Sequence, residues 1–232
     1  MNSDKVSCIL VGAGRGARLG KNQSKALIKI NNIPLFYHTL KKFLNIKEIE
    51  EIILVLRKED IKTVKKILKN KLKKEINIKL TTGGKRRQDS VKKGLKLTSA
   101  FTKYVLIHDI ARPFIKKNLI RKMIKEIQNA KVQGLVLGRR AVNTLKEVNF
   151  VKNQVYIKRT LDRKKIFEVY TPQIFEKESF LKSYFSLNKK EVFDDSQIFE
   201  HLKKMKIKVF ETQELNIKIT YPQDLVLAKK LL

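Results

Sequence analysis

The sequence predicts an α/β protein with a doubly wound, mainly parallel sheet and a projecting β-hairpin. Short apolar runs typical of buried strands alternate with segments that carry apolar residues at helical spacing, as in right-handed βαβ units. The first apolar run opens into a glycine-rich loop, which is typical of phosphate-binding α/β proteins. After Gly138 the pattern changes to the residue-by-residue alternation of two paired strands.

The first 137 residues contain the alternating part of this pattern. Apolar runs such as EIILVL predict strands, and the spacing of Ile61, Val64, Ile67 and Leu68 predicts a helix. Asp89 or Ser90 could cap a following helix. The predicted strands are Val6–Val11, 51–56, 76–80, 104–108 and 134–137. The predicted helices are 35–44, 60–72, 91–97 and 119–130.

The stretch from 142 to 171 predicts a long hairpin. Residues alternate in NTLKEV and in QVYIKRT, with a turn near Asn153. Its apolar residues, among them Val155, Ile157 and Phe167, need cover that a second subunit could supply. The chain is therefore expected to be a single domain over 1–232 with a β-arm at about 142–170. Beyond the arm we expect helices at 177–187 and 195–205, strands at 207–210 and 215–219, and a last helix near Pro222.

Composition excludes several classes of protein. No run approaches 18 uncharged apolar residues, so a transmembrane helix is not expected, and the N-terminus is too short before its glycines for a signal peptide. A cytoplasmic location follows. The single Cys8 predicts a small buried residue rather than a disulfide or nucleophile. The formal charge is +31, but the lysines are spread over all predicted helices. This favours solvated helix faces over specific nucleic-acid binding.

The loop after the first strand is the strongest site candidate. Four glycines in the nine residues 12–20 let backbone N–H groups turn toward an anion, and Arg15, Arg18, Lys21 and Lys25 add positive charge. These features predict a nucleoside triphosphate site.

Two other phosphate-binding patterns fit this loop less well. Gly12, Gly14 and Ala17 match G-x-G-x-x-G/A, but the acidic residue expected about 20 positions later is missing. The Walker pattern fails because Asn22 follows Lys21. An ordinary βα turn is the remaining alternative.

Two further motifs follow predicted strands, so they should lie at the same sheet edge. The segment 83–91, GGKRRQDSV, could bind a nucleobase through backbone groups, or it could be a simple helix-capping turn. Asp109 ends another strand, where a carboxylate is well placed to hold Mg²⁺ on a triphosphate. Arg112 could bind a second phosphate. For His108 we favour a packed core histidine.

These motifs together make the chain similar to the 2-C-methyl-D-erythritol 4-phosphate cytidylyltransferases of the non-mevalonate isoprenoid pathway. The resemblance implies a Rossmann-like nucleotidyltransferase sheet, a homodimer joined through the arm, and Mg²⁺ as cofactor. The implied reaction converts CTP and 2-C-methyl-D-erythritol 4-phosphate to CDP-methylerythritol and pyrophosphate. The similar blocks, in order, are GAGRGARLG with Lys25, PLFYHTL, GGKRRQDSVKKGL, VLIHDIARPF, NTLKEV, TLDRKKIFEVYTPQIF, FDDSQIFE and NIKITYPQDLVLA.

The same resemblance implies roles for individual residues. The implied catalytic residues are Arg18, Lys25 and Lys218. The implied nucleotide contacts are Gly12, Ala13 and Gly14, with Gly84 and Ser90 at the cytosine. Asp109 is implied at the metal and substrate. The implied contacts of the sugar phosphate are Arg112, Thr144, Lys218, Thr171 and Arg163, the last from the partner subunit.

The chain also departs from the family pattern. Ser24 and Ala26 flank Lys25 where Pro and Gln are usual, Asn143 replaces an aspartate, and Lys85 replaces an acidic residue often found after the double glycine. Gly12 replaces a common alanine, as it does in ribitol- and ribulose-5-phosphate cytidylyltransferases. Those enzymes are the second interpretation. A lysine-rich RNA-binding protein is the third.

Overall fold

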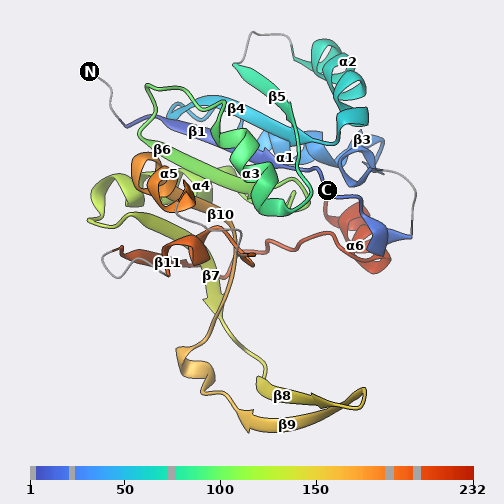
Figure 1. Cartoon of the computed structure of the whole chain (residues 1–232). Helices are drawn as coiled ribbons and strands as arrows, with labels where there is room; N and C mark the ends of the chain where they lie inside the picture. Colours follow the sequence, from blue (N-terminus) through green and yellow to red (C-terminus); the bar gives the residue numbers. More distant parts are fainter. Residues whose placement is uncertain (1–3, 21–23, 73–76, 186–190, 201–204) are drawn as a thin grey trace.

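The computed structural model describes residues 4–20, 24–72, 77–185, 191–200 and 205–232. Its centre is a seven-stranded sheet with the strand order β11-β7-β10-β6-β1-β4-β5 (Figure 1). β10 runs antiparallel to both neighbours, and the other six strands run parallel to one another. The doubly wound, mainly parallel sheet is confirmed. Its strands are β1 (Val6–Val11), β4 (Ile49–Leu56), β5 (Ile78–Thr82), β6 (Tyr104–Asp109), β7 (Gly134–Arg140), β10 (Phe167–Glu176) and β11 (Ile207–Glu211).

Helices cover both faces of this sheet. One core cluster packs α1 (Leu35–Phe43), α2 (Ile61–Lys71) and α4 (Lys117–Asn129) on the first face, where α6 (Pro222–Leu231) adds Ala228. The other cluster packs α3 (Arg87–Leu95) and α5 (Lys177–Phe185) on the second face. Among the described residues, no helix is both long enough and apolar enough to cross a membrane. Cys8 is fully buried in β1, as predicted.

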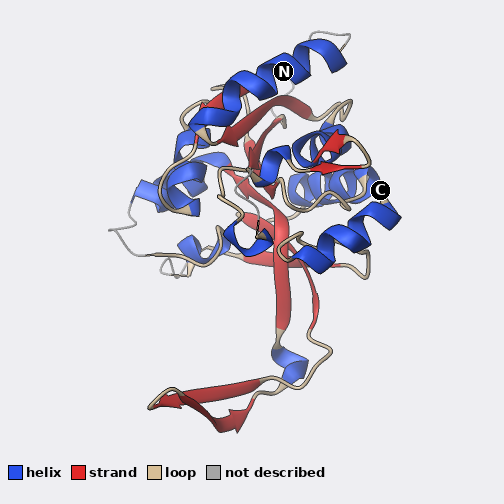
Figure 2. Cartoon of the chain, turned by 90° about the vertical axis from the view of Figure 1, so that its right-hand side faces the viewer, coloured by secondary structure: helices blue, strands red, loops and turns tan. Residues whose placement is uncertain are grey.

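The predicted hairpin is present and stands away from the body of the molecule (Figures 1 and 2). β8 (Lys146–Val151) pairs antiparallel with β9 (Gln154–Thr160). Lys152 and Asn153 form the turn with positive φ angles of 46° and 65°, as two-residue hairpins require. Phe150 and Ile157 are 77% and 68% exposed. The arm therefore presents apolar side chains that a single subunit leaves uncovered.

Several local expectations were wrong. The third helix begins at Arg87, four residues early, so Asp89 lies inside its first turn and accepts a hydrogen bond from the Arg86 N–H at 3.1 Å. Only a 3₁₀ turn, Ser196–Phe199, occurs in the predicted helix 195–205, whose residues 201–204 lie outside the described residues. β10 was missed as a central strand. Most other predicted elements are present, with ends shifted by one to three residues.

The segment 215–219 forms no strand, contrary to prediction. It crosses the carboxyl ends of the central strands instead of pairing along a sheet edge. The Ile219 N–H donates to the Ala111 carbonyl at 2.8 Å, and the Lys218 ammonium reaches Asp109. The alternating apolar residues that predicted a strand include Ile219, which is instead buried against the first face of the sheet. The result places Lys218 above the sheet edge where ligands bind.

The remaining elements of the fold are short. A small hairpin pairs two strands beside α6, and 3₁₀ turns connect the larger elements. These elements are β2 (Lys29–Ile30), β3 (Ile33–Pro34), η1 (Ala17–Leu19), η2 (Lys25–Leu27), η3 (Lys58–Asp60), η4 (Arg163–Lys165) and η5 (Ser196–Phe199).

Candidate active site

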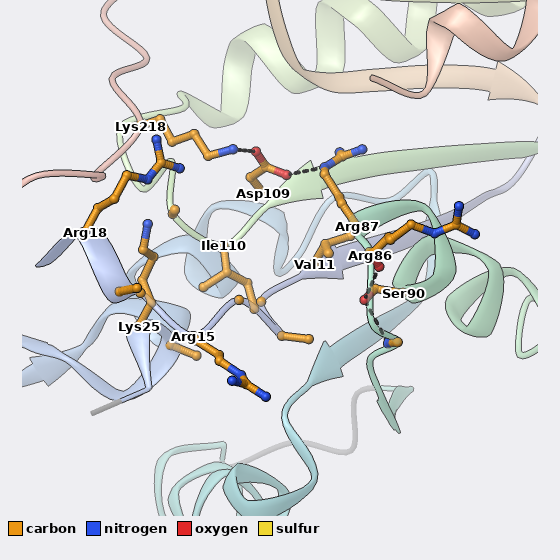
Figure 3. A pocket seen from close by; sticks show the side chains of 18 of the residues that line it. Val11, Arg15, Arg18, Lys25, Arg86, Arg87, Ser90, Asp109, Ile110 and Lys218 are labelled. Carbon is orange, nitrogen blue, oxygen red and sulfur yellow. Dashed lines mark hydrogen bonds and ion pairs between the residues drawn. The ribbon is translucent and has the colours of Figure 1, made fainter. Parts of the chain in front are cut away.

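A cavity of about 350 Å³ opens at the carboxyl ends of β1, β5 and β6 (Figure 3). This volume suits a small-molecule ligand. The loops that follow these three strands form its walls, and the segment before α6 closes one side. The expectation that the motifs gather at one sheet edge is confirmed. The predicted site residues that line the cavity are Gly12, Ala13, Gly14, Arg18, Lys25, Gly84, Ser90, Asp109 and Lys218.

The glycine-rich loop needs its glycines for backbone shape and for close approach. Gly16 and Gly20 have φ angles of 70° and 65°, a region that favours glycine. A Cβ on Gly83 would stand 2.2 Å from the Cβ of Ala13, so the loops after β1 and β5 touch only because this position is glycine. Gly14 faces open space. The loop thus offers bare backbone to a ligand.

Positive charge dominates the cavity wall. Seven basic side chains and one carboxylate line it among the residues that the structure describes; Lys21 lies outside them. Burial, together with the nearby charges of Lys218 and Arg18, lowers the pKa of Lys25. Its ammonium donates to the Ile219 carbonyl at 2.9 Å. Cations collected at this density favour a polyanionic ligand.

Asp109 is the single carboxylate among these described lining residues, and it is surrounded by cations. Its Oδ2 lies 2.7 Å from the Lys218 ammonium, and its Oδ1 accepts a hydrogen bond from Arg87 Nε at 3.1 Å. Arg112 Nε lies 3.9 Å from Oδ2. Burial alone would raise the pKa of Asp109, but Arg87 and Lys218 hold it well below its usual range. Asp109 is therefore ionised at neutral pH.

Thr171 holds the backbone of Asp109 in place. Its Oγ1 accepts a hydrogen bond from the Asp109 N–H at 3.0 Å, and its carbonyl accepts one from the Asn216 amide at 2.7 Å. Arg112 Nη1 donates to the Asn216 carbonyl at 2.8 Å, and its guanidinium lies over the Tyr170 ring. Thr171 and Arg112 thus lie next to Asp109 without lining the cavity.

Thr144 and Arg163 lie away from the cavity of their own subunit. Both are exposed near the base of the arm, and Arg163 Nη1 donates to the Val142 carbonyl at 2.8 Å. The structure does not bring these two residues together with Asp109 within one chain. A role for them in a partner's site remains a prediction.

The loop after β5 forms the opposite wall. Ser90 Oγ accepts a hydrogen bond from the Gly84 N–H at 3.0 Å and donates a long one to the Arg86 carbonyl at 3.3 Å. Ser90 therefore fixes the shape of this wall (Figure 3). Lys85 also lines the cavity, where the family pattern often has an acidic residue.

Two residues of the site were not singled out from the sequence. Arg87 is one of three consecutive basic residues, and nothing local distinguishes it from its neighbours. Ile110 fills the space where a Cβ on Gly12 would stand, with its Cδ1 only 2.5 Å from that point. The glycine that replaces the common alanine therefore accommodates Ile110.

The few side chains of the cavity that could coordinate a metal ion suit one that enters already bound to phosphate groups. No group of three or more acidic, histidine or cysteine side chains that could hold a metal ion occurs in the described ranges. Mg²⁺ in nucleotide enzymes is typically held by one or two carboxylates together with substrate phosphates. Asp109, ionised and facing the cavity, fits that pattern.

Comparisons with known proteins show the family to which the chain belongs. The family model described as "IspD: 2-C-methyl-D-erythritol 4-phosphate cytidylyltransferase" matches residues 6–232. The chain belongs to this family. A Clostridium botulinum enzyme of that name is 35% identical over 98% of this chain and 97% of its own length. One from Dictyoglomus thermophilum is 37% identical over 96% and 94%.

Solved structures show the same relationship. The 4-diphosphocytidyl-2C-methyl-D-erythritol synthase of Anaerococcus prevotii superposes with a TM-score of 0.83 at 30% identity, covering 98% of this chain and 95% of that one. The Francisella tularensis 2-C-methyl-D-erythritol 4-phosphate cytidylyltransferase gives a TM-score of 0.78 at 27% identity, covering 98% and 100%. The α/β fold of this family member is therefore shared over its whole length.

His108 supports the turn that follows Asp109. It is fully buried, as predicted, and packs against the Phe43 ring with the centroids 5.1 Å apart. Its Nε2 lies 3.0 Å from the Arg112 carbonyl. Burial lowers the pKa of His108 to about 4. The imidazole is therefore neutral at pH 7 and donates to that carbonyl.

This shift predicts a specific pH dependence of stability. The folded pKa lies below the unfolded one, so between pH 6.5 and 4 the unfolded chain binds more protons. Stability due to His108 is complete above pH 6.5 and falls by up to about 3 kcal/mol toward pH 4. In His108→Gln, whose amide can still donate to the Arg112 carbonyl, the free energy of unfolding should fall less over this range. Urea denaturation at several pH values measures the free energy of unfolding of both proteins. If the two free energies fall by the same amount between pH 6.5 and 4, the prediction is wrong.

Proposed function

We propose that this chain transfers CMP from CTP to 2-C-methyl-D-erythritol 4-phosphate, giving CDP-methylerythritol and pyrophosphate. The observation that carries the proposal is the cavity itself. Among the described residues, a bare glycine loop and seven basic side chains surround one ionised carboxylate, in a chain that the family model matches over residues 6–232. A triphosphate and a second phosphate are the ligands that such a charge distribution accommodates.

The chemistry requires two anions to meet. An oxygen of the acceptor phosphate attacks the α-phosphorus of CTP in line, the bond to the β-phosphate oxygen breaks, and pyrophosphate leaves. Arg18 and Lys25 would hold the triphosphate, and Lys218 lies beside them at the cavity wall (Figure 3). Fixed cations that stabilise developing charge supply most of the rate enhancement in such reactions. No covalent nucleophile is required.

The cofactor proposed for this reaction is Mg²⁺. Asp109 together with the nucleotide phosphates would hold it, and when bound it neutralises charge on the triphosphate. The cations around Asp109 keep this carboxylate ionised, so it needs no deprotonation before it can act as a ligand.

We also propose a homodimer that exchanges its arms. A two-stranded hairpin with exposed apolar residues is unstable alone in water, and a two-fold dimer would bury both arms at once. Arg163 is exposed near the base of the arm. In the dimer it would reach the partner's substrate phosphate, where Thr144 also contributes.

The proposal is tested by measuring pyrophosphate release with Mg²⁺. CTP should be used in preference to ATP, GTP and UTP, since a site that hydrogen-bonds one base leaves polar groups unpaired with another. The acceptors to compare are 2-C-methyl-D-erythritol 4-phosphate, ribitol 5-phosphate and ribulose 5-phosphate, and the first should be preferred. Equal turnover with ATP, or preference for a pentose phosphate, would overturn the assignment.

Lys25 should be essential for phosphate handling. Lys25→Ala is expected to lower kcat/KM by about 100-fold, the effect of losing one contact to transition-state charge. Lys25→Arg should recover only part of this, because a planar guanidinium does not replace an ammonium. The pKa of Lys25 is lowered, so its ammonium loses its proton at a lower pH than an ordinary lysine does. The kcat/KM of the wild-type protein should therefore fall as the pH rises into the alkaline range. The arginine variant should not show this fall. Near wild-type kinetics for Lys25→Ala would remove it from the site.

The shared site predicts complementation between two inactive variants. Lys25→Ala and Arg163→Ala should each be nearly inactive, but refolded together in equal amounts they should recover roughly a quarter of wild-type activity. Random pairing makes about half of the dimers mixed, and each mixed dimer has one intact site of two.

The neighbouring Lys164→Ala is the matched control and should be active without a partner variant. If mass spectrometry confirms mixed dimers and no activity returns, Arg163 does not serve the partner's site.

A further inference from the structure

Arg87 joins two carboxylates that are distant in sequence. Its Nε donates to Asp109 Oδ1 at 3.1 Å, and its Nη1 lies 2.8 Å from Asp195 Oδ2. Burial alone would lower the pKa of Arg87, but Asp195 and Asp109 together raise it. Arg87 thus carries a permanent positive charge between two negative ones.

Asp195 is held rigidly for this contact. It is fully buried at the start of a 3₁₀ turn, and the neighbouring Asp194 carboxylate anchors that turn. Asp194 accepts hydrogen bonds from the Gln173 amide at 2.7 Å and from the Gln197 N–H at 3.0 Å. Asp195 Oδ1 has no hydrogen-bond partner in the part of the chain that is described, and Oδ2 has only the ion pair with Arg87. Burial raises the pKa of Asp195 and the Arg87 charge opposes this rise, so the ionised form of Asp195 depends on Arg87.

This arrangement bears on what Asp109 can bind. Both of its oxygens contact cations, one from Arg87 and one from Lys218. A divalent metal that binds Asp109 competes with these cations for the carboxylate and loosens their contacts. Arg87 keeps a carboxylate partner at Asp195 when this happens, so its charge is not left unpaired in a buried place. Without the Asp195 charge, Arg87 would hold Asp109 alone and would repel an incoming cation.

We propose that Asp195 is a positioning residue that shares Arg87 and so keeps Asp109 available to the divalent metal of the nucleotide complex. This inference rests on the proposed function, since it concerns the same metal and the same nucleotide. Asp195 itself does not line the cavity. It acts through the Arg87 guanidinium.

The test is the effect of Mg²⁺ on CTP affinity, measured by calorimetry without an acceptor so that no turnover occurs. The measured quantity is the ratio of the dissociation constant in EDTA to that in saturating Mg²⁺. In Asp195→Asn this ratio should fall about tenfold, the order expected for one unit charge lost within about 10 Å. Affinity in EDTA should be unchanged or tighter. The Mg²⁺ concentration for half-maximal pyrophosphate release should rise by a similar factor.

Two variants separate charge from packing. Asp195→Glu keeps the charge and should keep the ratio within about threefold of wild type. Glu51→Gln is the matched control, because Glu51 is a buried carboxylate paired with Lys79 at 2.6 Å near the opposite end of the strands. It should leave the ratio unchanged. If Asp195→Asn does not fold, Asp195→Ser replaces it, since it also removes the carboxylate charge and keeps a polar side chain, and it too should lower the ratio.

The outcomes are distinguishable. The inference is overturned if Asp195→Asn keeps the wild-type ratio, if it weakens CTP binding equally in both conditions, or if Asp195→Glu loses as much as Asp195→Asn. If Asp195→Ser is used instead, an unchanged ratio in that variant overturns the inference. If wild-type protein does not bind CTP in either condition, the proposed function itself fails.

Discussion

The site depends on the ion pairs of one carboxylate, Asp109. Lys218 from the segment before α6 and Arg87 from the start of α3 contact its two oxygens. Thr171 of β10 accepts a hydrogen bond from the Asp109 backbone N–H. Four parts of the chain therefore meet at one residue. Without this negative charge, the cations would repel one another across the cavity.

The direction of the strands explains why these parts can meet there. Parallel strands end at a common edge, so the loops after β1, β5 and β6 converge there. The one antiparallel strand, β10, adds what this arrangement lacks. It brings Thr171 back to Asp109 and connects directly to the base of the arm. β10 therefore runs from the base of the arm to Thr171, which holds Asp109 at the cavity.

Burial distinguishes Lys25 and Lys218 from the many exposed lysines of the chain. All five lysines of α2 are exposed, and no acidic side chain of that helix balances them. Lys25 and Lys218 are half-buried and aimed at the cavity. A lysine in contact with water is neutralised by solvent and salt at little cost, whereas a half-buried one needs an anion. The high net charge of the chain therefore says little about its function.

The sequence alone determined those features of the fold that depend on residues close together in the chain. Val6–Val11 and its glycine loop follow from an apolar run and unhindered backbone, and the arm follows from residue alternation around a turn at Asn153. The motif residues at Lys25, Ser90 and Asp109 are brought to one edge because parallel strands allow no other outcome. Only the tertiary structure decided the place of β10, the path of 215–219 and the bridge from Arg87 to Asp195. Each depends on a partner about 30 to more than 100 residues away, and no local propensity specifies which distant hydrogen bond or charge a segment will find.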